Sequence, residues 1–283
     1  MQHWQIGNVK ITRVVELEIA GGTRFILPDA LRDAVLPIRW LRPHFADEDG
    51  NLIMSIHALV VETPTRRILV DTCLGNDKER QIPLWHMRSG PFLDDLESAG
   101  YPADSIDTVL CTHLHVDHVG WNTRLVDGRW VPTFENASYL FGREEWEHWD
   151  AHADEDQMGI AVDDSVRPIV EADLHQLVEV DHDLGEGVTL EPTRGHTPGH
   201  VSVRIRSRGE EALITGDFIH HPCQMARLGW CSSADFDAEQ AKATRLAMLE
   251  SLADRPVLVI GTHFATPSAG RVVRDGDAYR LDV

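Results

Sequence analysis

The stretch THLHVDHVGW, residues 112–121, constrains this chain more than any other part of its sequence. It directly follows the apolar run IDTVLC, which predicts a short buried strand. Within six positions it carries three imidazoles and a carboxylate: His113, His115, Asp117 and His118. Neutral imidazole and carboxylate are the side chains that bind zinc-like metals. We therefore expect a fold in which the end of this strand faces a metal site.

Three more predicted strands end at a residue of the same kind. VTLEPTRG, ALITG and VLVIGT lead into His196, Asp217 and His263, and a glycine stands one or two residues before each of them. Strand ends on one rim of a sheet can converge on a cleft, and glycine permits close approach of the backbone. Seven candidate ligands are more than one tetrahedral metal needs. The pattern therefore favours two adjacent metal ions bridged by a carboxylate.

Strands and helices alternate along the rest of the chain. Residues 56–72 read as a hairpin with a Pro-Thr turn, and residues 136–150 as a strand that passes into a helix. Residues 91–100 have helical spacing with a terminal glycine, and residues 237–254 read as an amphipathic helix with a capping-box spacing. This order favours a layered α/β fold over an all-β barrel. No repeat or linker divides the chain, so we predict a single domain over residues 1–283.

Composition limits the partners and the compartment. The formal net charge is -20 and no cluster of Lys or Arg stands out, so nucleic acid is not an expected partner. No apolar run is long enough to span a membrane and no signal peptide is visible, which predicts a cytoplasmic protein. The four cysteines form no C-x-x-C pair and are expected to be reduced thiols.

Taken together, the H-x-H-x-D-H run, the later Gly-His, the Gly-Asp after a strand and the last strand-end His resemble the metallo-β-lactamase superfamily. The resemblance implies a four-layered αββα sandwich with the site at one edge of the sheets. It also implies a role for each ligand. The first metal is assigned to His113, His115 and His196, the second to Asp117, His118 and His263, the bridge to Asp217, and an outer, orienting position to Asp71 in ILVDTCLG.

These ligands suit zinc, with manganese, cobalt or iron as the other choices, and no cysteine stands at a ligand position. Members that bind a redox di-iron pair replace one His of the first run with Glu, and this chain does not. The expected reaction is hydrolysis, in which a metal-bridging hydroxide attacks the substrate and Asp117 moves a proton.

Within the superfamily the chain resembles the branch of N-acyl-homoserine lactonases and methyl parathion hydrolase. The features that carry this are the long N-terminal segment, GDFIHH, FDAEQAKATR and the short tail after THFATPSAG. The lactonases have a Tyr three residues after the bridging Asp, where this chain has His220. His220 is therefore predicted to be a catalytic residue that donates a hydrogen bond to the developing oxyanion. Residues 20–50 are predicted to be a long loop or dimerisation segment, and the resemblance implies a homodimer.

Aromatic residues are expected to line the substrate pocket: Phe25, Trp40, Trp121 and Trp230. They favour a small, moderately apolar substrate, which we predict to be a lactone or a carboxylic or aryl ester, or else an organophosphate triester. A metallo-β-lactamase that opens β-lactam rings is the alternative. A thioesterase or a nuclease would need further substrate-binding elements. A non-catalytic metal-binding module would not need all seven ligands or Asp117.

Overall fold

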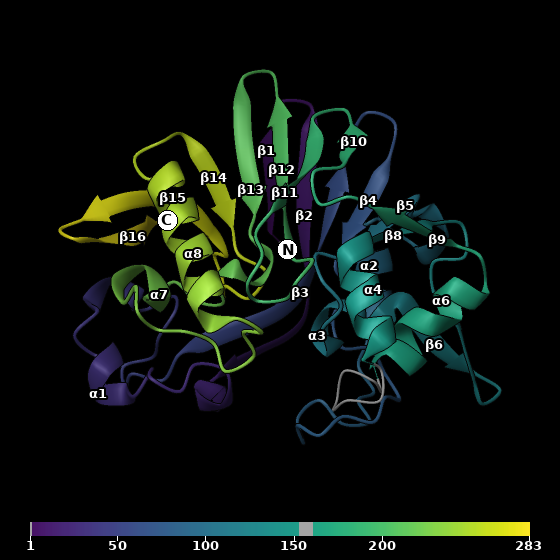
Figure 1. Cartoon of the computed structure of the whole chain (residues 1–283), viewed down its shortest axis with the longest axis horizontal. Coiled ribbons are helices and arrows are strands. Elements are labelled where there is room, and N and C mark those ends of the chain that lie inside the picture. The colour runs from purple at the N-terminus through teal and green to yellow at the C-terminus, as the bar shows by residue number, and fades with distance from the viewer. Residues whose placement is uncertain (1, 153–160) are drawn as a thin grey trace. The chain divides into compact units, whose positions relative to one another are not determined.

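A computed structural model describes residues 2–152 and 161–283 (Figure 1). Its contacts divide the chain into two compact units. The first unit comprises Met1–Glu16 and Ile56–Val180, and the second unit comprises Leu17–Ser55 and Asp181–Val283. The organisation as a single domain stays a prediction.

The first sheet has seven strands and lies mostly in the first unit. Two strand segments belong to the second unit: the Leu17–Ala20 end of β2 and the Ile53–Ser55 start of β3. In spatial order they are β1 (Gln2–Ile6), β2 (Val9–Ala20), β3 (Ile53–Glu62), β4 (Arg67–Val70), β5 (Thr108–Leu110), β8 (Ser138–Gly142) and β9 (His175–Val178). The predicted hairpin is confirmed as the antiparallel pair β3–β4. From β4 to β9 the strands are parallel. The carboxyl ends of β4 and β5 therefore lie at the same edge, where the amide of Asp71 donates to the carbonyl of Leu110 at 2.9 Å.

Short helices and a small hairpin complete the first unit. They are α2 (Phe92–Ser98), η3 (Ala103–Ser105), α3 (Val116–Val119), η4 (Gly120–Asn122), the hairpin β6–β7 (Thr123–Val126 and Arg129–Pro132), α4 (Arg143–Ala151), the π-helical turn η5 (Val162–Val166) and α6 (Arg167–Glu171). The predicted strand-to-helix passage is confirmed, because β8 runs directly into α4, which packs against β8 and β9 (Figure 1).

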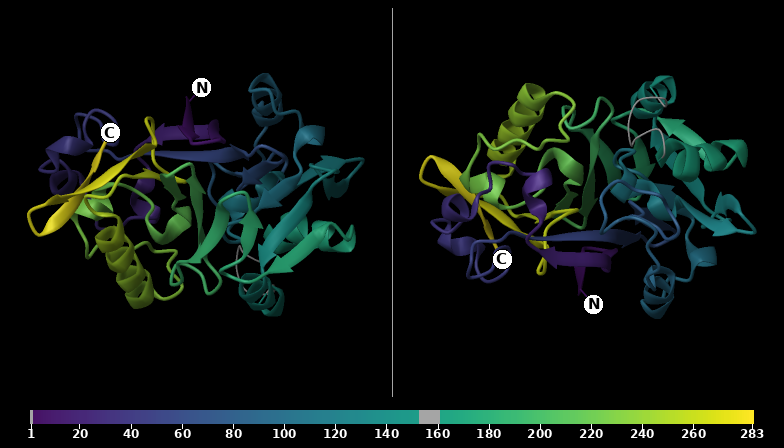
Figure 2. Two further views of the ribbon diagram at one scale, coloured as in Figure 1. Left: turned by 90° about the horizontal axis from the view of Figure 1, so that it is seen from above. Right: turned by 90° about the horizontal axis from the view of Figure 1, so that it is seen from below.

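The second sheet also has seven strands. They are β10 (Asp183–Gly185), β11 (Val188–Pro192), β12 (Val201–Ser207), β13 (Glu210–Ile214), β14 (Val257–Ile260), β15 (Ala269–Asp275) and β16 (Ala278–Asp282). β12 is antiparallel to both β11 and β13, and β14 is parallel to β13. It follows that β11, β13 and β14 run in the same direction and end at the same edge. The β15–β16 hairpin forms the far end of this sheet (yellow in Figure 2).

The helices of the second unit are η1 (Thr23–Phe25), α1 (Arg32–Val35), η2 (Arg39–Leu41), η6 (Gly216–Phe218), α7 (Cys223–Ala226) and α8 (Ala238–Leu252). The predicted amphipathic helix is α8. Its N-cap is the carboxylate of Asp237, which accepts the amide of Gln240 at 3.0 Å, as the capping spacing indicates. The buried positions recur at helical spacing: Ala241, Arg245, Met248, Leu249 and Leu252. Across the residues that the structure describes, no helix combines the length and the apolar character needed to cross a membrane.

Residues 20–50 are largely irregular, as predicted, and most of their large apolar side chains are buried or partly buried, whereas Phe25 and Leu31 are exposed. Leu27, Val35, Leu41 and Phe45 are buried in one core cluster with residues of α8 and β14. The apolar content of this segment is therefore explained by packing inside the second unit. The homodimer stays a prediction.

A buried histidine ties this segment to the rest of the second unit. The ring of His221 accepts the amide of Cys223 at Nδ1 (3.0 Å), so its Nε2–H donates to the carbonyl of Phe45 (2.8 Å). Both bonds need the neutral ring, and burial lowers the pKa of His221 to about 4.

We expect this histidine to make folding sensitive to acid. In the unfolded chain its pKa returns to about 6.5, so the unfolded state binds the proton first, and stability is lost as pH falls from 6.5 towards 4. The full loss is about 3 kcal/mol in the free energy of unfolding. Thermal or urea unfolding of metal-free protein between pH 7 and pH 4 measures it, with His221→Gln as the comparison. An equal pH slope for the two proteins would contradict this assignment.

Candidate metal site

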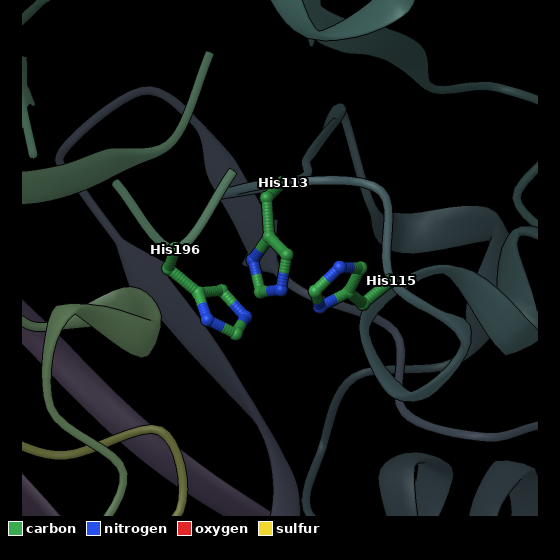
Figure 3. Close-up of side chains that lie close together, drawn as sticks. All are labelled: His113, His115 and His196. Atoms are coloured by element: carbon green, nitrogen blue, oxygen red, sulfur yellow. The ribbon is translucent and has the colours of Figure 1, made fainter. Parts of the chain in front are cut away.

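The first group of candidate ligands occupies the loop after β5 and the short helix α3. His113 and His118 are buried, and His115 and Asp117 are half-buried. The ring centroid of His113 lies 4.6 Å from that of His115 and 4.0 Å from that of His118. Figure 3 shows the rings of His113 and His115 side by side. The tight turn from strand to helix thus gathers these imidazoles, as the spacing predicted.

Asp71 orients this group. It is buried, follows β4 directly, and accepts the amide of Thr112 at 2.8 Å. Its second oxygen lies 2.9 Å from Nδ1 of His118. The hydroxyl of Thr112 donates to Asp71, so its oxygen can accept Nδ1–H of His113 at 3.1 Å. In both histidines Nδ1 is engaged by the protein, which leaves Nε2 as the atom available to a metal.

Two glutamates that the sequence reading missed, buried Glu145 and half-buried Glu16, also hold this region. Glu145 in α4 accepts the amide of Leu114 at 3.1 Å and the indole N–H of Trp149 at 2.7 Å. Glu16 accepts the amide of Leu74 at 2.7 Å, and burial raises the pKa of its carboxyl. In REEWEHWD nothing distinguishes the buried glutamate from its exposed neighbours, because only the contact with the loop after β5 sets it apart.

The second group lies at the edge where β11, β13 and β14 end. One carboxylate oxygen, Oδ2 of Asp217, is the centre of the group. Nε2 of His263 lies 3.1 Å from it, Nε2 of His220 3.3 Å and Nε2 of His196 3.5 Å. All four side chains are buried. His196, Asp217 and His220 each offer a ligand atom, and these atoms lie within 4.8 Å of one another.

Each strand-end ligand of this group has its own partner within the second unit. Nδ1 of His196 lies 2.9 Å from Oδ1 of Asp235, and Nδ1 of His263 lies 3.0 Å from the carbonyl of Ser55. The amide of Asp217 donates to Nε2 of His200 at 2.6 Å, which gives that histidine a structural role. Burial raises the pKa of the Asp235 carboxyl. Asp235 was also missed, because 39 residues separate it from the histidine that it contacts.

His220 differs from these ligands. Both of its ring nitrogens are buried and neither has a hydrogen-bond partner among the described residues. Its ring is parallel to that of His263, with centroids 5.9 Å apart, and meets that of His196 edge to face at 4.7 Å. It is thus placed against the ligand group by packing and by Asp217, without an orienting bond to Nδ1.

Glycine is required beside two of the ligands. A Cβ on Gly195, which has a φ of +123°, would lie 2.2 Å from the amide nitrogen of Ala241 in α8. A Cβ on Gly216 would lie 2.6 Å from Nε2 of His200. These close approaches account for the glycines that the sequence shows before His196 and Asp217.

The predicted pocket aromatics are in different environments. Phe25 is exposed, and Trp40 and Trp230 are partly buried against the core of the second unit. Trp121 is buried, stacks on Phe92 with centroids 5.7 Å apart, and donates its indole N–H to Glu16 at 2.8 Å. These contacts make Trp121 a core residue of the first unit and not a wall of a substrate pocket, in contrast to the prediction. A further aromatic residue, Trp149, has its ring centroid 5.9 Å from that of His115.

The donors of both groups fit a divalent metal of the zinc type. They are imidazole nitrogens and carboxylate oxygens alone. Four of the histidines are held by an orienting bond through the opposite ring nitrogen: His113, His118, His196 and His263. In the second group, three buried Nε2 atoms face one carboxylate oxygen, which is an arrangement that a cation would stabilise. Figure 3 also labels His196, the member of this group that follows β11.

The fold and these groups define a class: an α/β protein with helix-flanked sheets, whose strand ends carry histidines and aspartates that can bind metal. Residues 54–263 match the model of the metallo-beta-lactamase superfamily, which is more than half of the 283 residues. The chain belongs to this family. The family and the α/β fold predicted from the sequence are thereby confirmed.

Relatives with described activities are distant. An N-acyl homoserine lactonase of Bacillus cereus is 26% identical over 171 residues, which are 56% of this chain and 61% of the relative. A probable metallo-hydrolase of Mycobacterium tuberculosis is 25% identical over 196 residues, which are 60% of this chain and 58% of the relative. The chain thus spans less than two thirds of the length of these relatives.

Solved structures show the same fold over almost the whole chain. The hydrolase AbOPH of the beta lactamase superfamily has a TM-score of 0.81 at 24% identity, covering 99% of this chain and 96% of that one. AidC, a dizinc quorum-quenching lactonase in complex with the product N-hexanoyl-L-homoserine, has a TM-score of 0.79 at 21% identity with the same coverage.

Proposed function

We propose that this protein is a metal-dependent hydrolase that cleaves a lactone or a carboxylic or aryl ester, with an organophosphate triester as the nearest related substrate. The observation that carries the proposal is the set of three buried imidazole nitrogens around Oδ2 of Asp217. A purely structural histidine cluster has no need to place three Nε2 atoms on one carboxylate. The relatives named as lactonases and metallo-hydrolases support the same reading.

We propose two divalent ions, most simply zinc, held jointly by the two groups. The first ion is assigned to His113, His115 and His196, the second to Asp117, His118 and His263, and the bridge to Asp217. Membership in the family supports this joint use, because the matched residues include every one of these positions. Bound divalent ions would lower the pKa of a water to about 7 and polarise the carbonyl or phosphoryl oxygen of the substrate.

The side chains would then supply proton transfer and orientation. The carboxylate of Asp117 is 13% exposed and lies 3.7 Å from Nε2 of His118. It is therefore accessible enough to take the proton of the attacking water and to give it to the leaving alkoxide, so that an ester yields an acid and an alcohol. His220 would donate a ring N–H to the carbonyl oxygen as negative charge develops there.

Charge and surroundings favour a neutral substrate. The formal net charge of -20 disfavours the approach of anions, and β-lactams carry a carboxylate. Half-buried Trp149 offers aromatic surface 5.9 Å from the ring of His115. Exposed Phe25 and the partly buried Trp40 and Trp230 are proposed as further aromatic contacts of the substrate. Aromatic walls bind uncharged acyl groups well.

A substrate panel with defined metal loading tests the proposal. N-acyl homoserine lactones, aryl esters, a phosphotriester and a cephalosporin are compared by kcat/KM, using metal-free protein and protein reconstituted with zinc. We expect close to two ions per chain, activity that depends on them, and higher kcat/KM for lactones or aryl esters than for the cephalosporin. A protein that takes up no transition metal, or that prefers the cephalosporin to every lactone and ester, would reject the proposal.

A further inference from the structure

Residues 232–237 form a turn, here named the 232–237 turn. It makes three hydrogen bonds with the loop that carries His196. The amide of Phe236 donates to the carbonyl of His196 at 3.0 Å, and the amide of Asp237 donates to the carbonyl of Gly195 at 2.9 Å. The third bond joins side chains, since Oδ1 of Asp235 lies 2.9 Å from Nδ1 of His196. Both the backbone and the ring of His196 are therefore held by one short segment.

Asp235 is itself fixed in place. Its side chain is 1% exposed, and its second oxygen accepts the amide of Ser232 at 2.9 Å. The hydroxyl of Ser232 accepts the amide of Ala234 at 3.1 Å, which closes the turn. Oδ2 of Asp235 is thus hydrogen-bonded within the turn, and Oδ1 contacts the ring of His196.

Helix α8 anchors the two ends of this arrangement. Buried Arg245 donates to the carbonyl of Trp230 at 2.7 Å, just before the turn, and Thr244 donates to the carbonyl of Arg194 at 2.7 Å, just before the His196 loop. The close approach of Gly195 to Ala241 adds a direct backbone contact with the same helix. The turn and the His196 loop therefore rest on a common rigid support.

We propose that Asp235 is a positioning residue that fixes the hydrogen of His196 on Nδ1 and so presents the lone pair of Nε2 to a metal. A carboxylate can only accept a hydrogen bond, so the 2.9 Å contact requires Nδ1–H. Nε2 is then the acceptor atom, and it is the one that faces Asp217. The inference rests on the proposed function, in which His196 is a metal ligand, and it makes the carboxylate of Asp235 part of the metal site.

Three variants separate this role from simple packing of the turn. Asp235→Ala removes the acceptor, and Asp235→Asn keeps an acceptor oxygen but not the charge. Asp237→Asn is the matched control two residues away, because asparagine caps a helix as well as aspartate does. Two measurements are made: ¹⁵N spectra of the His196 ring in metal-free protein, and zinc affinity by competition with a chelator.

We expect the wild type and Asp237→Asn to show the Nδ1–H form, and Asp235→Ala to lose it in favour of a mixture of ring forms. Zinc affinity should fall by about 10- to 100-fold in Asp235→Ala, less in Asp235→Asn, and not in Asp237→Asn. An unchanged ring form and affinity in Asp235→Ala, or an equal loss in Asp237→Asn, would overturn the inference. A wild type that binds no zinc would reject the proposed function instead, while the spectra of the metal-free proteins would still decide whether Asp235 sets the ring form.

Discussion

Replacement of Asp117 by asparagine is expected to lower kcat by about two to four orders of magnitude in a protein that stays folded. The amide keeps the shape of the side chain but loses the negative charge and the ability to accept a proton. Because Asp117 in α3 is only half-buried and asparagine has nearly the same volume, the substitution opens no cavity in the core. Proton transfer acts on the transition state, so kcat should fall more than KM rises.

Metal analysis accompanies the kinetics of this variant. The ion assigned to His113, His115 and His196 should be retained, and the ion assigned to Asp117, His118 and His263 should be held more weakly. Asp94→Asn, at an exposed position of α2, is the control for the loss of one carboxylate elsewhere in the first unit. Near-wild-type kcat with two bound ions in Asp117→Asn would show that this carboxylate neither holds a metal nor moves a proton.

The sequence was most informative where strand direction decides the geometry. His196, Asp217 and His263 could be grouped from the sequence because each follows an apolar strand, and β11, β13 and β14 do run in the same direction. Asp71 was assigned only through the resemblance to the family, and the structure supplies the physical reason, since β4 and β5 are parallel neighbours. A polar residue directly after an apolar run can be recognised locally in the sequence, and parallel strands bring such residues to the same edge of a sheet.

Contacts between distant segments could not be predicted from the pattern of strand ends. Whether Glu16, Glu145 or Asp235 faces solvent or a ligand loop depends on packing that joins segments tens of residues apart. Whether an apolar residue lies in the core or beside the site also depends on distant segments. The aromatic ring of Trp121 follows the ligand loop directly, yet it stacks on Phe92 in the core. An apolar residue next to a site and one in the core look alike in sequence.

Replacement of His220 by alanine is expected to lower kcat by about 10²- to 10³-fold, the usual cost of losing one donor to a developing oxyanion. The expectation rests on a contrast within the second group. His196 and His263 are each oriented through Nδ1, whereas neither nitrogen of His220 has a hydrogen-bond partner among the described residues. A ligand is usually fixed by such a bond, so the ring of His220 is better suited to meet a substrate oxygen than to hold an ion.

The competing role is ligation, because a nitrogen of His220 also lies within 4.8 Å of ligand atoms of His196 and Asp217. His220→Ala distinguishes the two roles when kcat and metal content are measured on the same sample. A donor role predicts lower kcat with two ions still bound, and partial recovery in His220→Gln, whose amide restores an N–H. The neighbouring variant His221→Gln serves as the control, since His221 bonds only within the fold and its replacement should leave kcat near the wild-type value at pH 7. Loss of one ion in His220→Ala would make His220 a ligand, and unchanged kcat with both ions would leave it as a packing residue.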